Sequence, residues 1–272
     1  MTYCQWTKKV CLLSHNMMWQ REVKNLAGGI MDNGLDSYVN NLTRVLKDMG
    51  SVVIAFSGGI DSALLAVMAH EILGDNTLAV TAWSPALAAR ELDDAKFLAE
   101  KFGFPHRVIK TFEMEKEGYV SNTPERCYFC KTELYGQLVS LAESEGYAYV
   151  ANGANVDDQG DYRPGMRAAK EHLVRSPMVE AGLSKDEVRG IARELNIPIW
   201  DKPAQPCLSS RIPYGIQVTP DFWRDVSDCG TISTTQPLIS RRHYGIRPQG
   251  YSIDWHHPHR LGGINYQQCP NR

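Results

Sequence analysis

A loop rich in glycine and hydroxyl groups, residues 57–62, constrains the fold more than any other segment. It follows the short β-branched run Val52–Phe56, which predicts a buried strand, and precedes Ala63–Ala69, which has helical spacing. A strand that turns through two glycines into a helix directs several backbone N–H groups at one point, where the helix dipole favours negative charge. We interpret the loop as a pyrophosphate cradle, lined by Ser57, Gly58, Gly59, Ile60, Asp61 and Ser62.

Short apolar runs and amphipathic segments alternate along the chain up to about Gly215. Such alternation favours right-handed βαβ units, so we expect the α/β class, with a doubly wound parallel sheet covered by helices on both faces. Ligands of these sheets bind beyond the carboxyl ends of the strands, where residues 57–62 would lie. The expected strands are Val52–Phe56, Leu78–Trp83, His106–Ile109 and Tyr147–Val150, and the expected helices are Leu35–Met49, Ala89–Phe102, Leu134–Glu145 and one opened by a capping box of Ser184 and Glu187.

Composition argues against several classes of protein. The formal net charge of −2 gives no general reason to expect nucleic-acid binding. No apolar stretch approaches the ~20 residues that a membrane-spanning helix needs, and residues 1–30 lack the pattern of a signal peptide. Seven unevenly spaced cysteines do not suit the disulfide framework of a secreted protein. We therefore expect a cytoplasmic protein whose spaced cysteines serve metal or redox chemistry.

Three cysteines stand in contexts that suit such chemistry. Cys127 and Cys130 form a Cys-x-x-Cys pair just before an expected helix, a spacing that lets both thiolates reach one metal centre. Cys207 lies between Lys202 and Arg211, whose charges favour a thiolate. Alone, the pair could be a redox dithiol, and Cys207 could be a small buried hydrophobic residue. Because no fourth cysteine lies nearby to complete a zinc site, a [4Fe–4S] cluster with one open iron suits the three better.

The loop of residues 57–62 resembles the PP-loop of ATP pyrophosphatases, which cleave ATP between its α and β phosphates, and does not match the phosphate loop of kinases. With three further segments it makes residues 34–226 similar to the LarE family of ATP-dependent sulfur transferases, which make the nickel-pincer nucleotide cofactor of lactate racemase. These segments are Arg126–Lys131, Asp157–Asp158 with Asp161–Gly165, and Pro206–Gly215.

The resemblance implies a reaction in two stages. A carboxylate of pyridinium-3,5-biscarboxylic acid mononucleotide attacks the α-phosphorus of ATP and releases pyrophosphate. A sulfur nucleophile then displaces AMP and leaves a thiocarboxylate. In one kind of family member the cysteine at Cys207 gives up its own sulfur and becomes dehydroalanine. In the other kind, cysteines at Cys127, Cys130 and Cys207 hold a [4Fe–4S] cluster that carries a hydrosulfide. This chain has all three cysteines, so we expect the second kind.

Other side chains receive candidate roles. Asp61 could hold the Mg²⁺ that ATP commonly needs, or cap the helix. Arg163 and Arg211 could grip phosphate or carboxylate, or form surface ion pairs. Trp83 could stack on adenine or on the substrate, or belong to the core. An acidic group could bind metal or cap a loop; its members are Asp157, Asp158 and Asp161.

Both ends of the chain depart from the α/β pattern. We expect residues 1–30 to be a disordered or non-native leader and residues 31–215 to form the PP-loop domain. The LarE family continues into a smaller C-terminal α/β domain. The similarity of this chain to the family can be followed only as far as Arg224. We expect residues 216–272 to be a remnant of it, and a homo-oligomer only if this region is intact. Three histidines near the end suit a solvated tail better than a metal site: His256, His257 and His259.

Two other functions fit the same motifs. A tRNA thiolation enzyme would share the loop and the cysteines, but it would need a basic RNA-binding surface that a nearly neutral chain does not advertise. An inactive homologue would bind the nucleotide or an iron–sulfur cluster without releasing pyrophosphate. ATP is the expected ligand of both alternatives, as it is of the sulfur transferase. The expected substrate of the leading reading is a small nucleotide.

Overall fold

The computed structural model describes residues 34–160, 163–203 and 207–219. Its centre is a four-stranded parallel sheet in the order β3-β2-β1-β4, which confirms the expected α/β class. The chain moves outward from β1 to β3 and then returns to place β4 on the other side of β1, so the strand order reverses between β1 and β4. Ligands of doubly wound sheets bind at such a reversal. The strands are β1 Val52–Ala55, β2 Thr77–Trp83, β3 His106–Lys110 and β4 Tyr149–Ala151.

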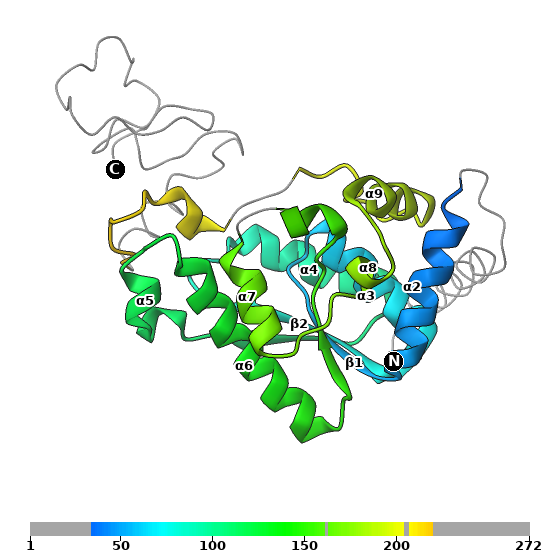
Figure 1. The fold of residues 1–272 in the computed structure, drawn as a ribbon, viewed down its shortest axis with the longest axis horizontal. Helices are drawn as coiled ribbons and strands as arrows, with labels where there is room; N and C mark the ends of the chain where they lie inside the picture. Colours follow the sequence, from blue (N-terminus) through cyan, green and yellow to red (C-terminus); the bar gives the residue numbers. More distant parts are fainter. Residues whose placement is uncertain (1–33, 161–162, 204–206, 220–272) are drawn as a thin grey trace, which may run out of the picture.

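Helices cover both faces of this sheet (Figure 1). The α-helices are α2 Asp36–Met49, α3 Ile60–Leu73, α4 Ala89–Phe102, α5 Glu117–Val120, α6 Arg126–Glu145, α7 Pro164–Glu171, α8 Pro177–Glu180 and α9 Lys185–Glu194. The 3₁₀ helices are η1 Gly74–Asn76, η2 Glu113–Glu115, η3 Val156–Gly160 and η4 Leu208–Arg211.

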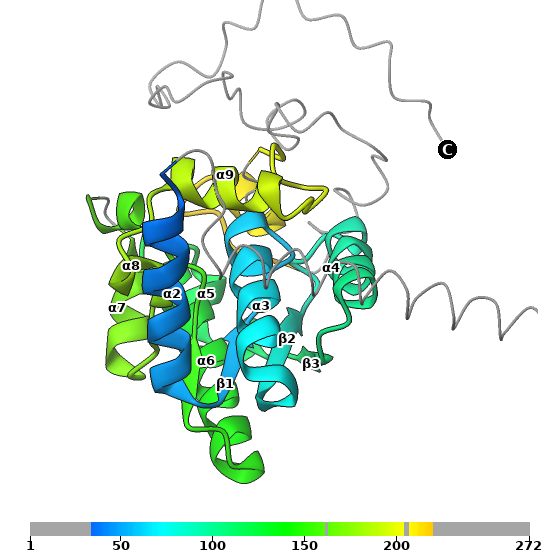
Figure 2. The ribbon, with the colours of Figure 1, turned by 90° about the vertical axis from the view of Figure 1, so that its right-hand side faces the viewer.

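The core lies in two layers on either side of the sheet. On one face, α3 packs on β1 and β2 and α4 packs on β2, while α2 and α9 pack on α3 and α8 packs on α2; Leu64 of α3 and Ile54 of β1 are fully buried. Figure 2 shows α2 and α3 side by side, with α9 across their ends. On the other face, α6 and α7 pack on the sheet through side chains such as Leu138 and Ala168. Since both faces are covered, the central strands β1 and β2 are nearly continuous buried runs, as parallel sheets require, whereas the edge strand β3 is largely exposed.

A third, smaller apolar cluster joins α5 and the start of α6 to residues 207–219. Tyr119, Leu208, Ile212 and Val218 are buried in it. In Figure 1 the gold segment that contains η4 lies beside α5, and the Val218 N–H donates to the Val120 carbonyl over 2.9 Å. This cluster attaches the last described segment to a part of the chain about ninety residues earlier.

Most element predictions agree with the structure. The helix Ala89–Phe102 is reproduced, and Ser184 and Glu187 form the expected capping box at the start of α9. The prediction for α6 was wrong at its start: the helix begins at Arg126, eight residues before Leu134, so Cys127 and Cys130 lie in it rather than before it. The aromatic residues between the two cysteines hid the helical pattern, and packing on α7 and the sheet supplies the stability that local propensity does not show.

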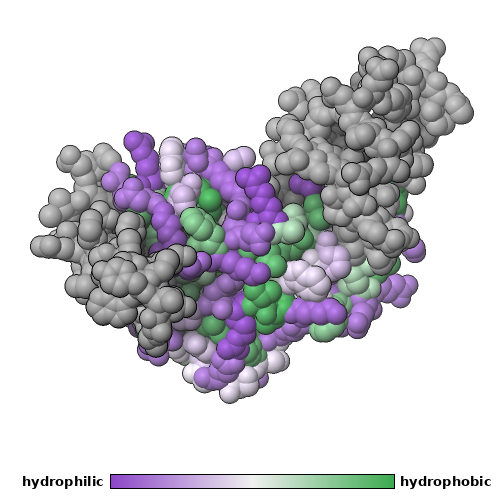
Figure 3. Space-filling view, turned by 180° about the vertical axis from the view of Figure 1, so that it is seen from behind, coloured by the Kyte–Doolittle hydropathy of each residue, from purple (hydrophilic) through white to green (hydrophobic). Residues whose placement is uncertain are grey.

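The surface of the described residues mixes polar and apolar side chains. Seen from behind, apolar side chains gather in the middle of the molecule and hydrophilic ones border them (Figure 3). None of the helices within residues 34–160, 163–203 and 207–219 is long and apolar enough to cross a membrane. The predictions for residues 1–30 and 220–272, including the three histidines, lie outside the described residues.

Candidate functional site

The loop between β1 and α3 folds as a tight cradle. Gly58 has φ +74°, a left-handed conformation that favours glycine, and a Cβ there would stand 3.2 Å from the Cβ of Ala95 and 3.3 Å from the carbonyl oxygen of Glu91. Gly59 is the N-cap of α3 and supplies no side-chain cap, so no side chain of the cap residue occupies the end of the helix. An uncapped helix start at the carboxyl edge of a parallel sheet can accept an anion.

Two serine hydroxyls face each other across this loop. The Oγ atoms of Ser57 and Ser62 are 3.1 Å apart, and the Ser57 N–H donates to Ser62 Oγ over 3.2 Å. The Gly59 N–H donates to Ser57 Oγ over 3.3 Å, and Ser62 Oγ donates to the Gly59 carbonyl over 3.0 Å. Ser57 is exposed whereas Ser62 is buried, so Ser57 presents its hydroxyl to solvent. The predicted residues 57–62 therefore form one compact, hydrogen-bonded loop.

The loop after β4 closes onto the same helix start. A Cβ on Gly153 would lie 2.8 Å from the backbone nitrogen and 2.9 Å from the Cα of Ser62. Asn152 fixes this loop, because its Oδ1 accepts from the Ala154 N–H over 3.0 Å and from Ser176 Oγ over 2.9 Å. The loops after β1 and β4 thus meet at the point where the strand order reverses.

Asp61 is paired rather than free. Its Oδ2 accepts from Lys185 Nζ over 2.5 Å, and its Oδ1 accepts from Asn155 Nδ2 over 3.0 Å. Its carboxylate does not cap α3. Sequence reasoning missed both Lys185 and Asn155. One signal was available for Lys185: a lysine at the first position of a helix faces the positive end of the helix dipole, which is unfavourable unless an anion lies nearby.

The acidic residues before α7 act in part as loop supports. Asp158 accepts from the Asn155 N–H over 3.0 Å and pairs with Arg163 at 2.5 Å. Asp157 accepts from the Lys185 N–H over 2.9 Å. Arg163 keeps 48% of its side chain exposed in this pair. The capped-loop interpretation therefore describes Asp157 and Asp158, while Asp161 lies outside the described residues.

A group of charged residues connects the phosphate loop to the segment of Cys207. Burial raises the pKa of Glu91, and the nearby charges of Lys202 and Arg211 oppose that shift. Lys202 also pairs with Asp94 at 2.7 Å. The Glu91 carbonyl packs against Gly58, and the charge of Arg211 acts on the Glu91 carboxyl. Arg211 therefore lies near the loop of residues 57–62.

Trp83, at the carboxyl end of β2, is 42% exposed and so does not belong to the core. Of the two positions that the sequence left open for Trp83, this exposure excludes the core. Exposure alone does not test whether Trp83 binds a ligand. Its stacking on adenine or on the substrate therefore stays a prediction.

Cys130 and the segment of Cys207 lie close together although they are far apart in the sequence, because Cys130 packs against the apolar cluster that contains Leu208 and Ile212. The three cysteines are free; Cys127 and Cys207 are exposed, and Cys130 is partly buried. Burial raises the pKa of Cys130 to about 12, Lys131 opposes this shift, and Cys207 and Cys127 add to it. Arg126, the neighbour of Cys127, donates to the Ser209 carbonyl over 2.6 Å, so the segments that carry the cysteines adjoin. Within the described residues, however, no group of three or more His, Cys, Asp or Glu side chains is arranged to hold a metal ion.

Comparisons with known proteins match this architecture. The family model for NAD synthase matches residues 33–123. An uncharacterised protein of Synechocystis is 49% identical over 185 residues, which cover 68% of this chain and 69% of that protein. The pyridinium-3,5-bisthiocarboxylic acid mononucleotide synthase of Lactiplantibacillus plantarum is 40% identical over 181 residues, 66% of either chain. The chain thus spans about two thirds of the length of these two relatives.

Two further matches are more distant. The tRNA-specific 2-thiouridylase MnmA of Rickettsia felis is 30% identical over 189 residues, which cover 56% of this chain and 52% of that protein. The structure of NMN synthetase from Francisella tularensis superposes with a TM-score of 0.50 at 21% identity, covering 72% of this chain and 95% of the other. At that identity the structural likeness supports the fold alone.

Proposed function

The chain belongs to the LarE family of PP-loop ATP pyrophosphatases, and from this premise we propose that it is an ATP-dependent sulfur transferase acting on a carboxylate of pyridinium-3,5-biscarboxylic acid mononucleotide. The observation that carries the proposal is the junction of two loops at the strand-order reversal, where uncapped α3 meets the Asp61–Lys185 pair. Family membership supports an enzyme that uses ATP. The substrate and the sulfur chemistry are the proposed part.

In the first stage a substrate carboxylate oxygen bonds to the α-phosphorus of ATP, and the bond from that phosphorus to the bridging oxygen breaks. Pyrophosphate leaves with the electron pair and an acyl adenylate forms. The N–H groups at the start of α3 and the hydroxyls of Ser57 and Ser62 would hold the pyrophosphate. Lys185 would neutralise its charge, and Asp61 would hold Mg²⁺, which screens the phosphates. Arg163 and Arg211 remain candidates for the phosphate or the second carboxylate of the substrate.

In the second stage a sulfur nucleophile attacks the acyl carbon, and AMP leaves. The donor set of Cys127, Cys130 and Cys207 suits a [4Fe–4S] cluster, since thiolates are its usual ligands. Such a cluster would supply a sulfide on its open iron. If Cys207 instead gave its own sulfur, its Sγ would bond to the acyl carbon and displace AMP. Loss of the Cα proton to a base and cleavage of the Cβ–Sγ bond would then release the thiocarboxylate and leave dehydroalanine.

The proposed product places the chain in the biosynthesis of the nickel-pincer nucleotide cofactor, with lactate racemase as the eventual user. We place it in the cytoplasm, where a reducing environment keeps cysteine thiols free. The proposal of a homo-oligomer depends on the region beyond the described residues.

The proposal is tested by separating the two stages. With ATP, Mg²⁺ and pyridinium-3,5-biscarboxylic acid mononucleotide, the full chain should release pyrophosphate and form AMP and a thiocarboxylate once a sulfide donor is supplied. Cys207→Ala should still release pyrophosphate but form no thiocarboxylate, because the thiol acts after adenylylation. Ser62→Ala should slow pyrophosphate release by about tenfold or more, as expected for the loss of one phosphate-binding donor. Pyrophosphate release that does not depend on the mononucleotide would overturn the proposal.

A tRNA thiolation enzyme is the second candidate, favoured by the similarity to the Rickettsia thiouridylase. The net charge of −2 gives it less support, because RNA binding depends on basic surfaces. Replacing the mononucleotide by tRNA in the same assay discriminates the two. Stimulation of pyrophosphate release by tRNA alone would favour the thiolation enzyme, and stimulation by neither would favour an inactive homologue.

A further inference from the structure

A buried arginine sits between the two cysteine-bearing segments. Arg126 is the first residue of α6 and precedes Cys127, yet only 3% of it is exposed. Its Nη1 donates to Asn122 Oδ1 over 2.5 Å and to the Ser209 carbonyl over 2.6 Å. Its guanidinium carbon also lies over the ring of Tyr214, 5.8 Å from the ring centroid. A single side chain thus connects the start of α6 to the backbone two residues after Cys207.

Burying a guanidinium is costly, and stability alone seldom explains it. Both hydrogen-bond partners of Arg126 are neutral oxygens, so the charge is not offset by a carboxylate in these contacts. Replacing a buried ion pair by apolar side chains is often neutral or stabilising, so a buried charge is weak evidence of a role in stability. The cost is understandable if the contact serves a second purpose, namely the placement of the segment it holds.

Asn122 extends the same contact along the Cys207 segment. It is fully buried and adopts φ +50°, a conformation uncommon outside glycine and asparagine. Its Nδ2 donates to the carbonyls of Pro213 and Ile216, each over 2.8 Å, and its own carbonyl accepts from the Gly215 N–H over 3.0 Å. Its Nδ2 also donates to the Ile212 carbonyl over 3.4 Å, so one asparagine binds the segment at four points.

A tyrosine hydroxyl supplies the last tie. Tyr119 OH lies 2.6 Å from Ser209 Oγ, in a buried position. Burial raises the pKa of Tyr119, so its hydroxyl stays protonated and can donate. Arg126 and Tyr119 thus hold the same serine, one through its backbone and the other through its side chain.

We propose that Arg126 is a positioning residue that, with Asn122, holds Cys207 beside Cys127 and Cys130 and so assembles the three thiols into one centre. The inference deepens the proposed function, since it rests on a shared role for the three cysteines. Its geometric content is independent of the substrate. Arg126 does not touch the reacting atoms; it acts through the Ser209 backbone on the position of Cys207.

The test measures thiol proximity directly in the full chain without cluster. Dibromobimane joins two thiols only when they lie within reach of one small linker, and peptide mass spectrometry identifies which cysteines are joined. In the wild type we expect Cys207 to be joined to Cys127 or Cys130. In Arg126→Met the yield of Cys207 crosslinks should fall by about tenfold, because the effective concentration of the tethered thiol falls. The Cys127–Cys130 crosslink lies within α6 and should be unchanged.

Two more variants separate positioning from general damage. Both hydrogen bonds of Arg126 come from one nitrogen, so Arg126→Lys can make them again and should restore part of the crosslink. Tyr119→Phe removes one hydroxyl and no charge, and should lower the Cys207 crosslink by a few-fold even if Arg126→Met does not fold. Arg167→Met, on the exposed side of α7, is the matched control and should behave as the wild type.

Each contrary result is decisive. A wild-type chain without Cys207 crosslinks would overturn the inference, whatever substrate the enzyme uses. Equal Cys207 crosslinking in the wild type, Arg126→Met and Tyr119→Phe would also overturn it. Intact crosslinking together with an absence of pyrophosphate release would instead count against the proposed function and leave the positioning role standing.

Discussion

At Gly153 one hydrogen atom decides whether two loops can meet. A methyl group there would overlap the Ser62 backbone at 2.8–2.9 Å, and backbone cannot move as a flexible side chain can. Gly153→Ala should destabilise the fold by about 1–3 kcal/mol, the usual cost of overpacking, and weaken ATP binding. Gly136→Ala is the control, because the nearest atom to its Cβ is 3.7 Å away within a helix, and it should stabilise by about 0.5–1 kcal/mol. Urea unfolding and equilibrium dialysis with ATP measure both effects; equal stability of the two variants would contradict the close-contact argument.

Lys185 carries the second prediction at this scale. Its ion pair with Asp61 is partly exposed, 28% on the lysine and 24% on the aspartate, so its contribution to stability is at most about 1 kcal/mol. Its charge should matter more for pyrophosphate. Lys185→Met should weaken pyrophosphate binding by about tenfold, as expected for one charge-assisted hydrogen bond. Lys101→Met, at a lysine that donates to the Asn196 carbonyl and lies over the Phe102 ring, should bind as the wild type does. If calorimetry shows equal affinity for pyrophosphate in the wild type and both variants, Lys185 serves only as the ion-pair partner of Asp61.

Single residues also show where sequence reasoning stops. The loop of residues 57–62 could be identified because the motif is contiguous, and its turn follows from glycine and helix-dipole physics. Lys185 and Asn155 could not, since their pairing with Asp61 joins residues 94 to 124 positions apart. Arg126 was visible as part of a motif, but its burial and its contact with Ser209 depend on the tertiary fold.

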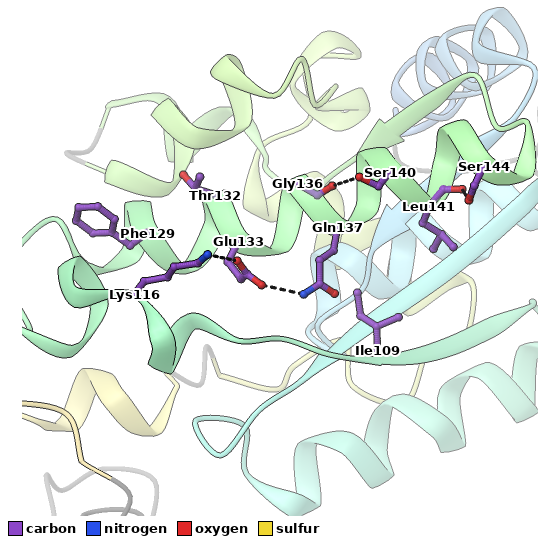
Figure 4. A pocket seen from close by; sticks show the side chains of 10 residues that line it. All are labelled: Ile109, Lys116, Phe129, Thr132, Glu133, Gly136, Gln137, Ser140, Leu141 and Ser144. Atoms are coloured by element: carbon purple, nitrogen blue, oxygen red, sulfur yellow. Dashed lines mark hydrogen bonds and ion pairs between the residues drawn. The ribbon is translucent and has the colours of Figure 1, made fainter.

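Among the elements, α6 links a pocket to the cysteine centre. The pocket, of about 710 Å³, lies along one side of α6 and extends from Phe129, next to Cys130, to Ser144 (Figure 4). In it Glu133 accepts from Gln137 over 2.9 Å and pairs with Lys116 at 3.3 Å, which ties α6 to the segment before α5. Partial burial raises the pKa of Glu133, but the bonds from Gln137 and Lys116 outweigh it, and the net pKa is lowered.

This lowered pKa makes the tie sensitive to acid. A carboxyl whose pKa is lower in the folded state stabilises the fold above its unfolded pKa of about 4.3, and that stability is lost as the pH falls through the folded value. Glu133→Gln should therefore lose less stability than the wild type on acidification from about pH 6 to about pH 3, by up to about 1 kcal/mol. Glu143→Gln, exposed on the same helix, should follow the wild type. Urea midpoints across this range provide the measurement, and parallel curves for all three chains would contradict it.

The elements themselves were largely predictable from periodicity. The strands and α4 follow from apolar runs and helical spacing, because packing on both faces of a parallel sheet imposes those patterns. The start of α6 was not predictable, since residues 126–133 face three surroundings: the Cys207 segment, α7 and the pocket. A helix with several different faces has no single apolar stripe.

In the whole molecule, the candidate site has two halves, the phosphate loop and the cysteine segments, and each half combines residues that are far apart in the sequence. The first part supplies the phosphate loop and the Cys127–Cys130 pair, while residues 163–219 return to supply Lys185, Arg211 and Cys207. The Glu91 carbonyl packs against Gly58 and the charge of Arg211 lowers the pKa of the Glu91 carboxyl, so Glu91 connects the halves. This arrangement suits a reaction in which the carboxylate is activated at one place and receives sulfur close by, without release of the adenylate.

The sulfur source is a property of the whole assembly, and iron content decides it. After anaerobic reconstitution the wild type should hold about four irons and as many acid-labile sulfides per chain. Because each thiol would hold one iron, Cys127→Ala, Cys130→Ala and Cys207→Ala should each lose most of this iron, while Cys11→Ala should retain it. Iron and sulfide analysis with the visible absorption spectrum provides the measurement. If the wild type binds no iron, Cys207 would have to be the donor, and its peptide should become lighter by one hydrogen sulfide after a single turnover. Iron retained in Cys207→Ala alone would instead remove that residue from the cluster and leave the Cys127–Cys130 pair with a ligand not yet identified.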